Sequence, residues 1–214
     1  MFKFNCFFIL LIIISFSNCA RHIIKKPLPE DEVLGGISHW QDEFRKKTGT
    51  GEITFSEPDY RFSCFFSFDY SLDRKALFGR LFGSFGISVG SFYFSRDSIS
   101  IRYRDGKEVK QTGSSGLKGL TDISLQRFFM WDIPLSSDPT VIPLNDGWIL
   151  SFSNLEVFLS LGFLPIRAIL QGNSEIIFEY SKFRTVEGEK QPFMIVGKSE
   201  DKRLEIEFRT MELQ

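Results

Sequence analysis

The chain has 214 residues, a formal net charge of −1 at pH 7 and 25 phenylalanines. This length is enough for one substantial domain. The nearly balanced charge argues against a nucleic-acid surface, which usually shows a basic excess. Phenylalanine is more abundant than a plain core needs, so the sequence predicts either a phenylalanine-rich β-core or an aromatic binding face.

The first 18 residues have the pattern of an export signal. Lys3 is followed by a ten-residue apolar run at 7–16, which is shorter than the ~20 residues needed to cross a bilayer and fits the central region of a secretory signal. Cys19 then stands where a bacterial lipoprotein signal carries its lipidated cysteine. We therefore expect residues 1–18 to be a lipoprotein signal peptide and Cys19 to be the lipid anchor. Ordinary cleavage near Ala20, which would leave a soluble exported protein, is the alternative.

Residues 19–30 are expected to form a tether between the lipid and the domain, because they contain two prolines and show no periodicity. Ala20, directly after the anchor, is consistent with the outer membrane rather than inner-membrane retention. The expected location is therefore the outer membrane, with the domain facing the periplasm. Cys6 leaves with the signal and Cys19 carries lipid, so Cys64 remains alone and no intrachain disulfide is expected.

A helix is predicted to open the domain, which we place at residues 31–214. It carries four apolar residues at helical spacing, namely Val33, Ile37, Trp40 and Phe44. Asp31 and Ser38 are both candidate caps, and the cost of Gly35-Gly36 inside a helix favours a start at Ser38. Trp40 and Phe44 are expected to contact the sheet. The helix that carries them is either a movable lid or a simple packing helix.

The stretch from Tyr60 to Asp105 predicts consecutive antiparallel strands with an aromatic face. Apolar and polar residues alternate in it, and alternation places successive side chains on opposite faces of a sheet. Strands are predicted near residues 60–70, 75–82, 84–94, 97–104 and 107–111. Gly83, Gly86 and Gly90 leave room for the sheet to curve, so we expect a hollow on its concave side.

The rest of the chain is mixed. Residues 117–131 are expected to be partly helical, and 155–164, which ends at Pro165, is interpreted as a second small helix. Strands return near 148–152, 175–180, 193–197 and 203–209, where one face is apolar and the other charged, as in an antiparallel sheet covered on one side. The predicted fold class is mainly β with flanking helices (α+β).

Two stretches resemble the LolA/LolB superfamily of periplasmic lipoprotein carriers and outer-membrane receptors, and LolB-like lipoproteins most. Residues 80–86 and 95–101 are similar to the family's strand, glycine corner and following strand, and residues 180–192 and 203–213 to its closing hairpins. The resemblance covers most of 31–214 and departs from the family pattern at about 112–165. It implies an incomplete antiparallel β-barrel, or half-barrel, with a helical lid over an apolar cavity. It also implies an exposed apolar loop that aids membrane insertion, for which Leu77 and Phe78, or Leu81 and Phe82, are the candidates.

The resemblance implies an outer-membrane-anchored lipoprotein that binds the acyl chains of lipid or lipoprotein cargo, in lipoprotein localisation or insertion or as a lipid carrier. The expected partners are acyl chains, the outer membrane and a periplasmic LolA-like carrier; nucleic acid is not expected, and the protein is expected to be a monomer. A structural or partner-binding envelope lipoprotein with the same fold and a filled core is the alternative. The residues expected to line the concave face are Phe62, Phe66, Phe68, Ile87, Val89, Ile99, Ile101, Phe178, Leu204, Ile206 and Phe208.

The sequence contains no pattern that indicates an enzyme. Hydrolases need a nucleophile with a base and metal sites need clustered ligands, but the chain has two histidines, one in the tether and one on the first helix. Cys64 lies on the apolar parity of its strand and is interpreted as a small buried hydrophobe. We therefore expect no catalytic residue, no metal and no cofactor.

Overall fold

The structure, a computed structural model, describes residues 28–42, 46–71, 73, 76–95, 98–112, 133, 135–172 and 174–213. The predicted signal peptide, Cys19, most of the tether, Phe44 and the predicted helical segment 117–131 lie outside the described residues. In the described part, no helix has the length and apolar character that crossing a membrane requires.

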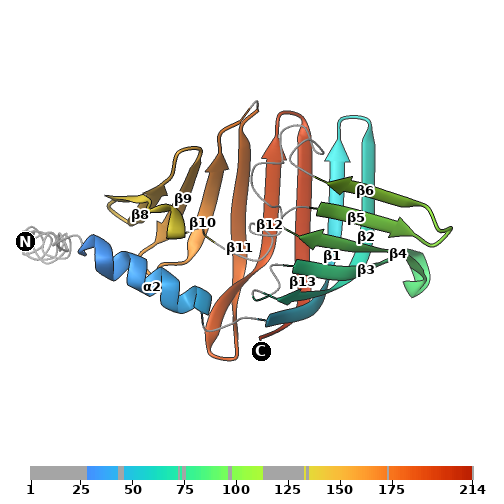
Figure 1. Ribbon diagram of the computed structural model, residues 1–214, viewed down its shortest axis with the longest axis horizontal. Coiled ribbons are helices and arrows are strands. Elements are labelled where there is room, and N and C mark those ends of the chain that lie inside the picture. Colours follow the sequence, from blue (N-terminus) through green and yellow to red (C-terminus); the bar gives the residue numbers. More distant parts are fainter. Residues whose placement is uncertain are drawn as a thin grey trace, which may run out of the picture.

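Strands dominate the described part, and one α-helix precedes them (Figure 1). The elements are α2 (Glu30–Asp42), β1 (Lys46–Glu57), β2 (Tyr60–Ser71), β3 (Ala76–Phe82), the 3₁₀ turn η1 (Ser84–Gly86), β4 (Ser88–Ser95), β5 (Ser98–Tyr103), β6 (Glu108–Thr112), the 3₁₀ turn η2 (Leu135–Ser137), β7 (Thr140–Pro143), β8 (Gly147–Ser151), β9 (Leu155–Ser160), β10 (Pro165–Leu170), β11 (Ile176–Val186), β12 (Glu189–Ser199) and β13 (Lys202–Leu213).

The strands form one antiparallel sheet with two wings. Its order is β6-β5-β4-β3-β2-β1-β13-β12-β11-β10-β9-β8-β7, so strands 1 to 6 form one wing and strands 7 to 13 the other. The first and last strands pair in the middle, from Lys47 opposite Leu213 to Ser56 opposite Arg203. The sheet is open, with β6 and β7 as its edges. The predicted mainly-β fold and open half-barrel are thereby confirmed, whereas the helical lid and the apolar cavity stay predictions.

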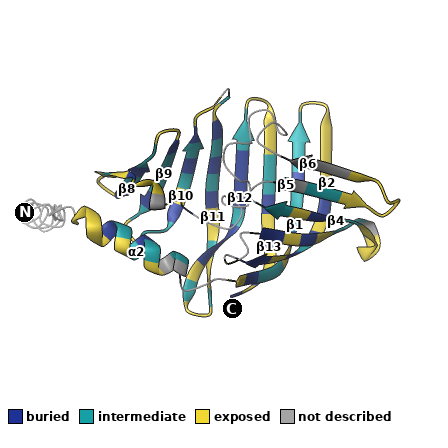
Figure 2. Ribbon diagram, viewed as in Figure 1, coloured by how far each residue is buried: buried dark blue, intermediate teal, exposed yellow. Residues whose placement is uncertain are grey.

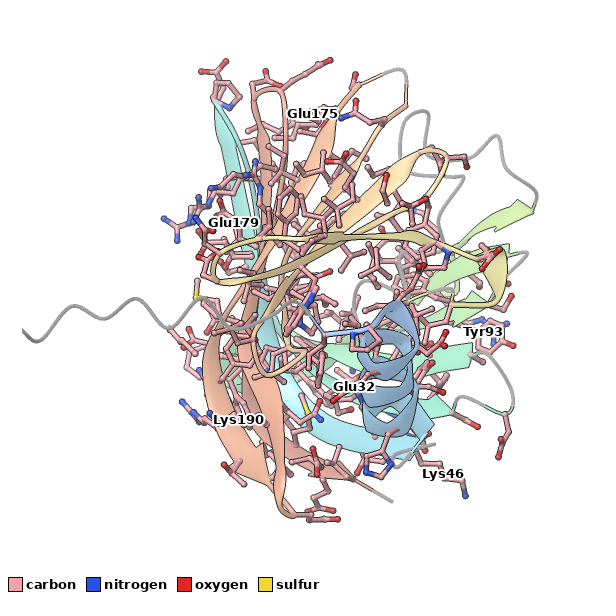
Figure 3. The ribbon with its side chains drawn as sticks, turned by 90° about the vertical axis from the view of Figure 1, so that its left-hand side faces the viewer. Glu32, Lys46, Tyr93, Glu175, Glu179 and Lys190 are labelled. Atoms are coloured by element: carbon pink, nitrogen blue, oxygen red, sulfur yellow. The ribbon has the colours of Figure 1, made fainter. Side chains whose placement is uncertain are left out.

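The sheet is curved, and its two faces differ in burial. In Figure 1 the strands β9–β13 run up the page while β3–β6 run across it, so the strand direction turns between the two wings. Figure 3 shows α2 in the hollow of the sheet, with Glu179 on the side facing away from the helix. In Figure 2, buried segments follow the strand centres, and exposed ones follow the hairpin ends and the outer side of α2. We call the side that faces α2 the concave face and the other side the outer face.

Helix α2 packs into the core through the apolar side predicted for it. Val33 and Ile37 have no exposed surface and belong to the same cluster as the buried strand residues. The expectation that the helix starts at Ser38 is wrong, because α2 runs through Gly35 and Gly36 from Glu30. A β-carbon on Gly36 would lie 2.7 Å from the ring of Phe163. The glycine that lowers helix propensity is therefore the residue that lets the helix approach the sheet.

The segment 155–164 is not a helix, as the sequence suggested, but strand β9 followed by a turn. Leu155, Val157 and Leu159 are buried while the residues between them are half-buried, so the relevant period is two. A short apolar run fits a buried helix or a buried strand equally well by composition. Strands β7 and β10 were not predicted either, because each is short and carries a proline at one end.

The two neighbouring glycines of α2 give a matched test of this packing. We expect Gly35→Ala to stabilise the protein by about 0.5–1 kcal/mol, because a β-carbon there meets nothing within 4 Å. Gly36→Ala should destabilise it by about 1–3 kcal/mol, because the ring of Phe163 stacks on Trp148 at a centroid distance of 5.1 Å and has limited room to yield. Urea denaturation of both variants measures the difference. Equal stability would contradict the packing of α2 against Phe163.

Candidate functional site

A continuous group of phenylalanine rings occupies the concave face where the two wings meet. Phe68 and Phe208 have ring centroids 5.4 Å apart, Phe66 and Phe208 6.1 Å, and Phe66 and Phe92 6.5 Å. Phe94 continues the row 5.1 Å from Phe92. The tilted and edge-on arrangements are those that aromatic pairs favour. We call these five residues, Phe66, Phe68, Phe92, Phe94 and Phe208, the aromatic row.

Glycines in the strands beneath make space for this row. Gly51 on β1 pairs with Phe66 on one side and with Phe208 on the other, and a β-carbon there would lie 2.8 Å from the Phe66 ring. Gly49 stands in the same relation to Phe68, at 2.9 Å. The central strand therefore contributes backbone rather than side chains at these positions, and rings from its neighbours cover it.

Most of the predicted concave-face residues do lie in or against the core. Phe66, Phe68, Phe178, Ile206 and Phe208 are buried, and Ile101 and Leu204 are partly buried against the same cluster. Phe62 has the right parity, opposite Phe55, but it stands near the strand end and is 46% exposed. The side chain of Ile99 lies outside the described part, as does that of Trp40.

The assignment of Ile87 and Val89 to the concave face stays a prediction, because the two residues lie at an irregularity of the sheet. Both are exposed, and Ile87 precedes β4. Phe92 and Phe94 on β4 face the core, because Phe92 pairs with Gly79 and Phe94 with Leu77. A register shift between Leu81 and Phe82 moves the parity by one, which exchanges the two faces of a strand. Phe92 and Phe94 are the functional candidates that sequence reasoning missed.

The structure corrects the assignment of Leu77 and Phe78 to an exposed loop. Both lie within strand β3, where Leu77 has no exposed surface and Phe78 is half-exposed on the outer face beside Tyr93. An exposed loop with apolar side chains follows β3, at 83–87. Its Phe85 is 99% exposed and has φ 63°, which is unusual for a residue with a β-carbon. The signal for it in the sequence was the pair of glycines around Ser84 and Phe85.

The concave face also contains a buried polar pair that sequence reasoning missed. Lys47 on β1 and Gln191 on β12 are 6% and 0% exposed, and the lysine Nζ donates to Gln191 Oε1 at 3.4 Å. Because an ammonium group can only donate, the amide oxygen must face it. The amide Nε2 then remains a buried donor for which the described residues offer no hydrogen-bond partner. This atom can donate to an acceptor that enters the interior.

Two buried titratable groups favour their neutral forms. Burial raises the pKa of the Cys64 thiol, and the nearby charge of Glu52 raises it further. The thiol therefore stays protonated at neutral pH and is a poor nucleophile. Burial likewise raises the pKa of the Tyr180 phenol. Among the described residues, no three or more His, Cys, Asp or Glu side chains gather closely enough to hold a metal ion.

Solved structures provide the comparison with known proteins. A LolA superfamily protein from Nitrosomonas europaea superposes with a TM-score of 0.61 at 10% identity, over 88% of this chain and 94% of that one. This chain has the LolA-type fold. A DUF1329 family protein from Desulfovibrio piger gives 0.61 at 8% identity, over 88% and 94% of the two chains. A Vibrio parahaemolyticus domain named for outer membrane lipoprotein sorting gives 0.60 at 6%, over 86% and 93%.

At these identities the likeness concerns the LolA-type fold alone. No protein-family model matches the sequence, and the comparison with curated proteins gives no significant match. The resemblance stated from the residues is thereby supported by the backbone.

The aromatic row gives a direct test of the assigned faces. Phe208→Ala should lower the free energy of unfolding by about 3–5 kcal/mol, because the ring is buried between Phe66 and Phe68. Phe62→Ala should cost less than about 1 kcal/mol, since its side chain is already half-exposed. Denaturant unfolding measures both. Equal losses would mean that Phe62 lies under cover on the concave face.

Proposed function

We propose that this protein is a lipid-anchored envelope protein that binds acyl chains of lipid or lipoprotein cargo on its concave face. The observation that carries the proposal is the aromatic row, an extended apolar strip along the hollow that α2 crosses. Binding of this kind needs apolar area and a cover that opens at low cost, and no covalent chemistry. We accordingly propose a carrier or receptor rather than an enzyme.

The edge of the row offers the natural place for an acyl chain. Phe66, Phe68 and Phe208 are buried, whereas Phe94 is only partly buried, as are Leu81 and Ile101 beside it. These half-buried residues lie on β3, β4 and β5, in the wing that α2 does not fill. A chain laid along them would bury their remaining surface and extend the row.

The outer-membrane location and the anchor at Cys19 are part of the same proposal. They are supported by the signal-like first 18 residues and by a fold shared with a domain named for outer membrane lipoprotein sorting. A LolA-like periplasmic carrier is the proposed donor of cargo. The exposed loop with Phe85 at its tip is proposed as the part of the domain that enters the bilayer.

A filled core is the second candidate, and it is favoured by a specific observation. Phe66, Phe68 and Phe208 are at most 4% exposed, and rings fill the space over the glycines of β1. In this case the fold would present its edges and outer face to a protein partner. The acyl-carrier and filled-core candidates differ in whether lipid displaces water from the half-buried residues at the edge of the row.

Native mass spectrometry of the expected mature chain, residues 19–214 with Cys19→Ser, tests the proposal. We expect acyl lipid to co-purify with the protein, or a fluorescent fatty acyl probe to bind it. Phe94→Ser together with Ile101→Ser should reduce probe binding by about tenfold or more, because two large apolar contacts are lost.

The control for this experiment lies on the other side of the same wing. Phe78→Ser with Tyr93→Ser removes two half-exposed side chains from the outer face and should leave probe binding unchanged. If the protein is purified free of lipid and also takes up no probe, the filled-core alternative is the better explanation. Equal loss in both double variants would mean that the aromatic row is not the binding surface.

The Phe85 loop gives a separate prediction about membrane contact. Phe85→Glu should leave the unfolding free energy within about 0.5 kcal/mol of the parent, because the side chain is 99% exposed. It should weaken partition of the unlipidated protein onto vesicles, since a charge replaces an apolar tip. Phe85→Leu is the matched control and should retain most of the binding. If the glutamate variant bound vesicles as well as the parent, the proposal that this loop enters the bilayer would be rejected.

A further inference from the structure

The outer face of the sheet divides into two regions of different charge. Over β11–β13 and β1, basic and acidic side chains pair: Lys182 with Glu207, Lys198 with Glu179, Arg203 with Glu205 and Arg209 with Glu52. In these four pairs each basic charge is offset by an acidic one. Over β3–β5 the basic residues that the structure describes are Arg80 and Arg102, with Arg104 in the turn after β5, and one ion pair is found for them, between Arg102 and Glu108.

The strand register brings these arginines together. Arg80 on β3 pairs with Ser91 on β4, and Ser91 pairs with Arg102 on β5, so the three side chains share the outer face. Arg104 stands in the turn directly after β5 and lines the same hollow as these residues. Its backbone N–H donates to the carbonyl of Val89 at 3.0 Å, which ties the end of β5 to the start of β4.

The four residues Arg80, Ser91, Arg102 and Arg104 line one hollow, which we call the arginine depression. It has a volume of about 470 Å³ and is open to solvent, and Ile87, Ser88, Gly90 and Tyr103 complete its walls. Guanidinium and hydroxyl groups are donors and favour an anionic, oxygen-rich ligand such as a phosphate. The depression is wide enough for such a group.

The charges around the depression are not balanced. Arg102 pairs with Glu108 at 3.3 Å, and Lys107 pairs with Asp105 at 3.2 Å. Arg80 and Arg104 have no acidic partner among the described residues. Two uncompensated guanidinium groups therefore face the depression, and exposed uncompensated cations attract an anionic surface.

Exposed apolar side chains surround the same arginines. Phe85 and Ile87 lie at the loop beside the depression, and Phe78 and Tyr93 lie on the outer face of β3 and β4. Their exposed fractions are 99%, 51%, 46% and 42%. Aromatic and apolar groups interleaved with basic ones are typical of protein surfaces that lie in the interfacial region of a bilayer.

We propose that the arginine depression binds the phosphate of anionic phospholipid headgroups and docks the β3–β5 wing on a bilayer surface. Figure 1 shows η1 at one end of the molecule and the start of α2 at the other. A lipid tether before α2 and the depression beside η1 would therefore hold the protein at two ends, with its long axis along the membrane. This inference concerns the outer face and does not require acyl chains in the hollow.

The test is sedimentation of the unlipidated chain, residues 19–214 with Cys19→Ser, with vesicles. This chain contains every helix and strand that the structure describes. We expect binding to phosphatidylcholine vesicles that contain phosphatidylglycerol, weaker binding to phosphatidylcholine alone, and a decrease with salt. Arg80→Gln with Arg104→Gln should lower the partition coefficient about 30-fold, on the basis of roughly fivefold for each basic side chain at an anionic surface.

Two further variants control for charge and folding. Arg61→Gln with Arg203→Gln removes the same two charges from exposed positions outside the depression and should lower binding by less than about threefold. Arg80→Lys with Arg104→Lys should restore most of the binding, because charge is the main term. Thermal unfolding is expected to be unchanged in all three, since each side chain is exposed.

The inference is overturned if the Arg80/Arg104 glutamine variant binds anionic vesicles as well as the parent, or if the control loses as much. It is also overturned if that variant loses affinity for inorganic phosphate but keeps its vesicle binding, because the depression would then be a free-anion site. Probe binding in the hollow, measured on the same variant, should be unchanged. Absence of probe binding in the parent with intact vesicle docking would reject the acyl-carrier function and leave this inference standing.

Discussion

The pairing of β1 with β13 is the constraint on which the rest of the structure depends. It joins a wing made by the first half of the chain to a wing made by the second. Gly49 and Gly51 on β1 let Phe66, Phe68 and Phe208 close over the junction. At Gly49 and Gly51, rings from the neighbouring strands occupy the space that side chains of β1 would otherwise fill. The aromatic row, the hollow in which it lies and the helix that crosses this hollow therefore all depend on this junction.

The two faces of the sheet present different surfaces to the surroundings. In the described part, the concave face is largely apolar and contains the buried pair of Lys47 and Gln191. The outer face is self-neutralised by ion pairs in one wing and arginine-rich in the other. An acyl chain and an anionic headgroup would therefore meet the same wing from opposite sides, since Phe94 and Arg80 lie on opposite faces of β3–β4.

Sequence reasoning succeeded where alternation was long and failed where a strand was interrupted. The parity of β2 and β13 placed Phe66, Phe68, Ile206 and Phe208 correctly, because twelve-residue strands fix a period of two. It missed Phe92 and Phe94 on β4, where a register shift follows η1 and changes the parity of the strand. It also took β9 for a helix, since a six-residue segment is too short to show a decisive period.

The sequence by itself determined the fold class, the antiparallel pattern, the apolar side of α2 and the aromatic character of the core. These follow from local periodicity and composition, which a single chain shows directly. Only the tertiary structure decided that Phe92 and Phe94 belong to the row, that Gly36 admits Phe163, and that Arg80, Arg102 and Arg104 meet at one depression. Such juxtapositions depend on the register between strands, and register is set by long-range pairing and bulges that no local pattern specifies.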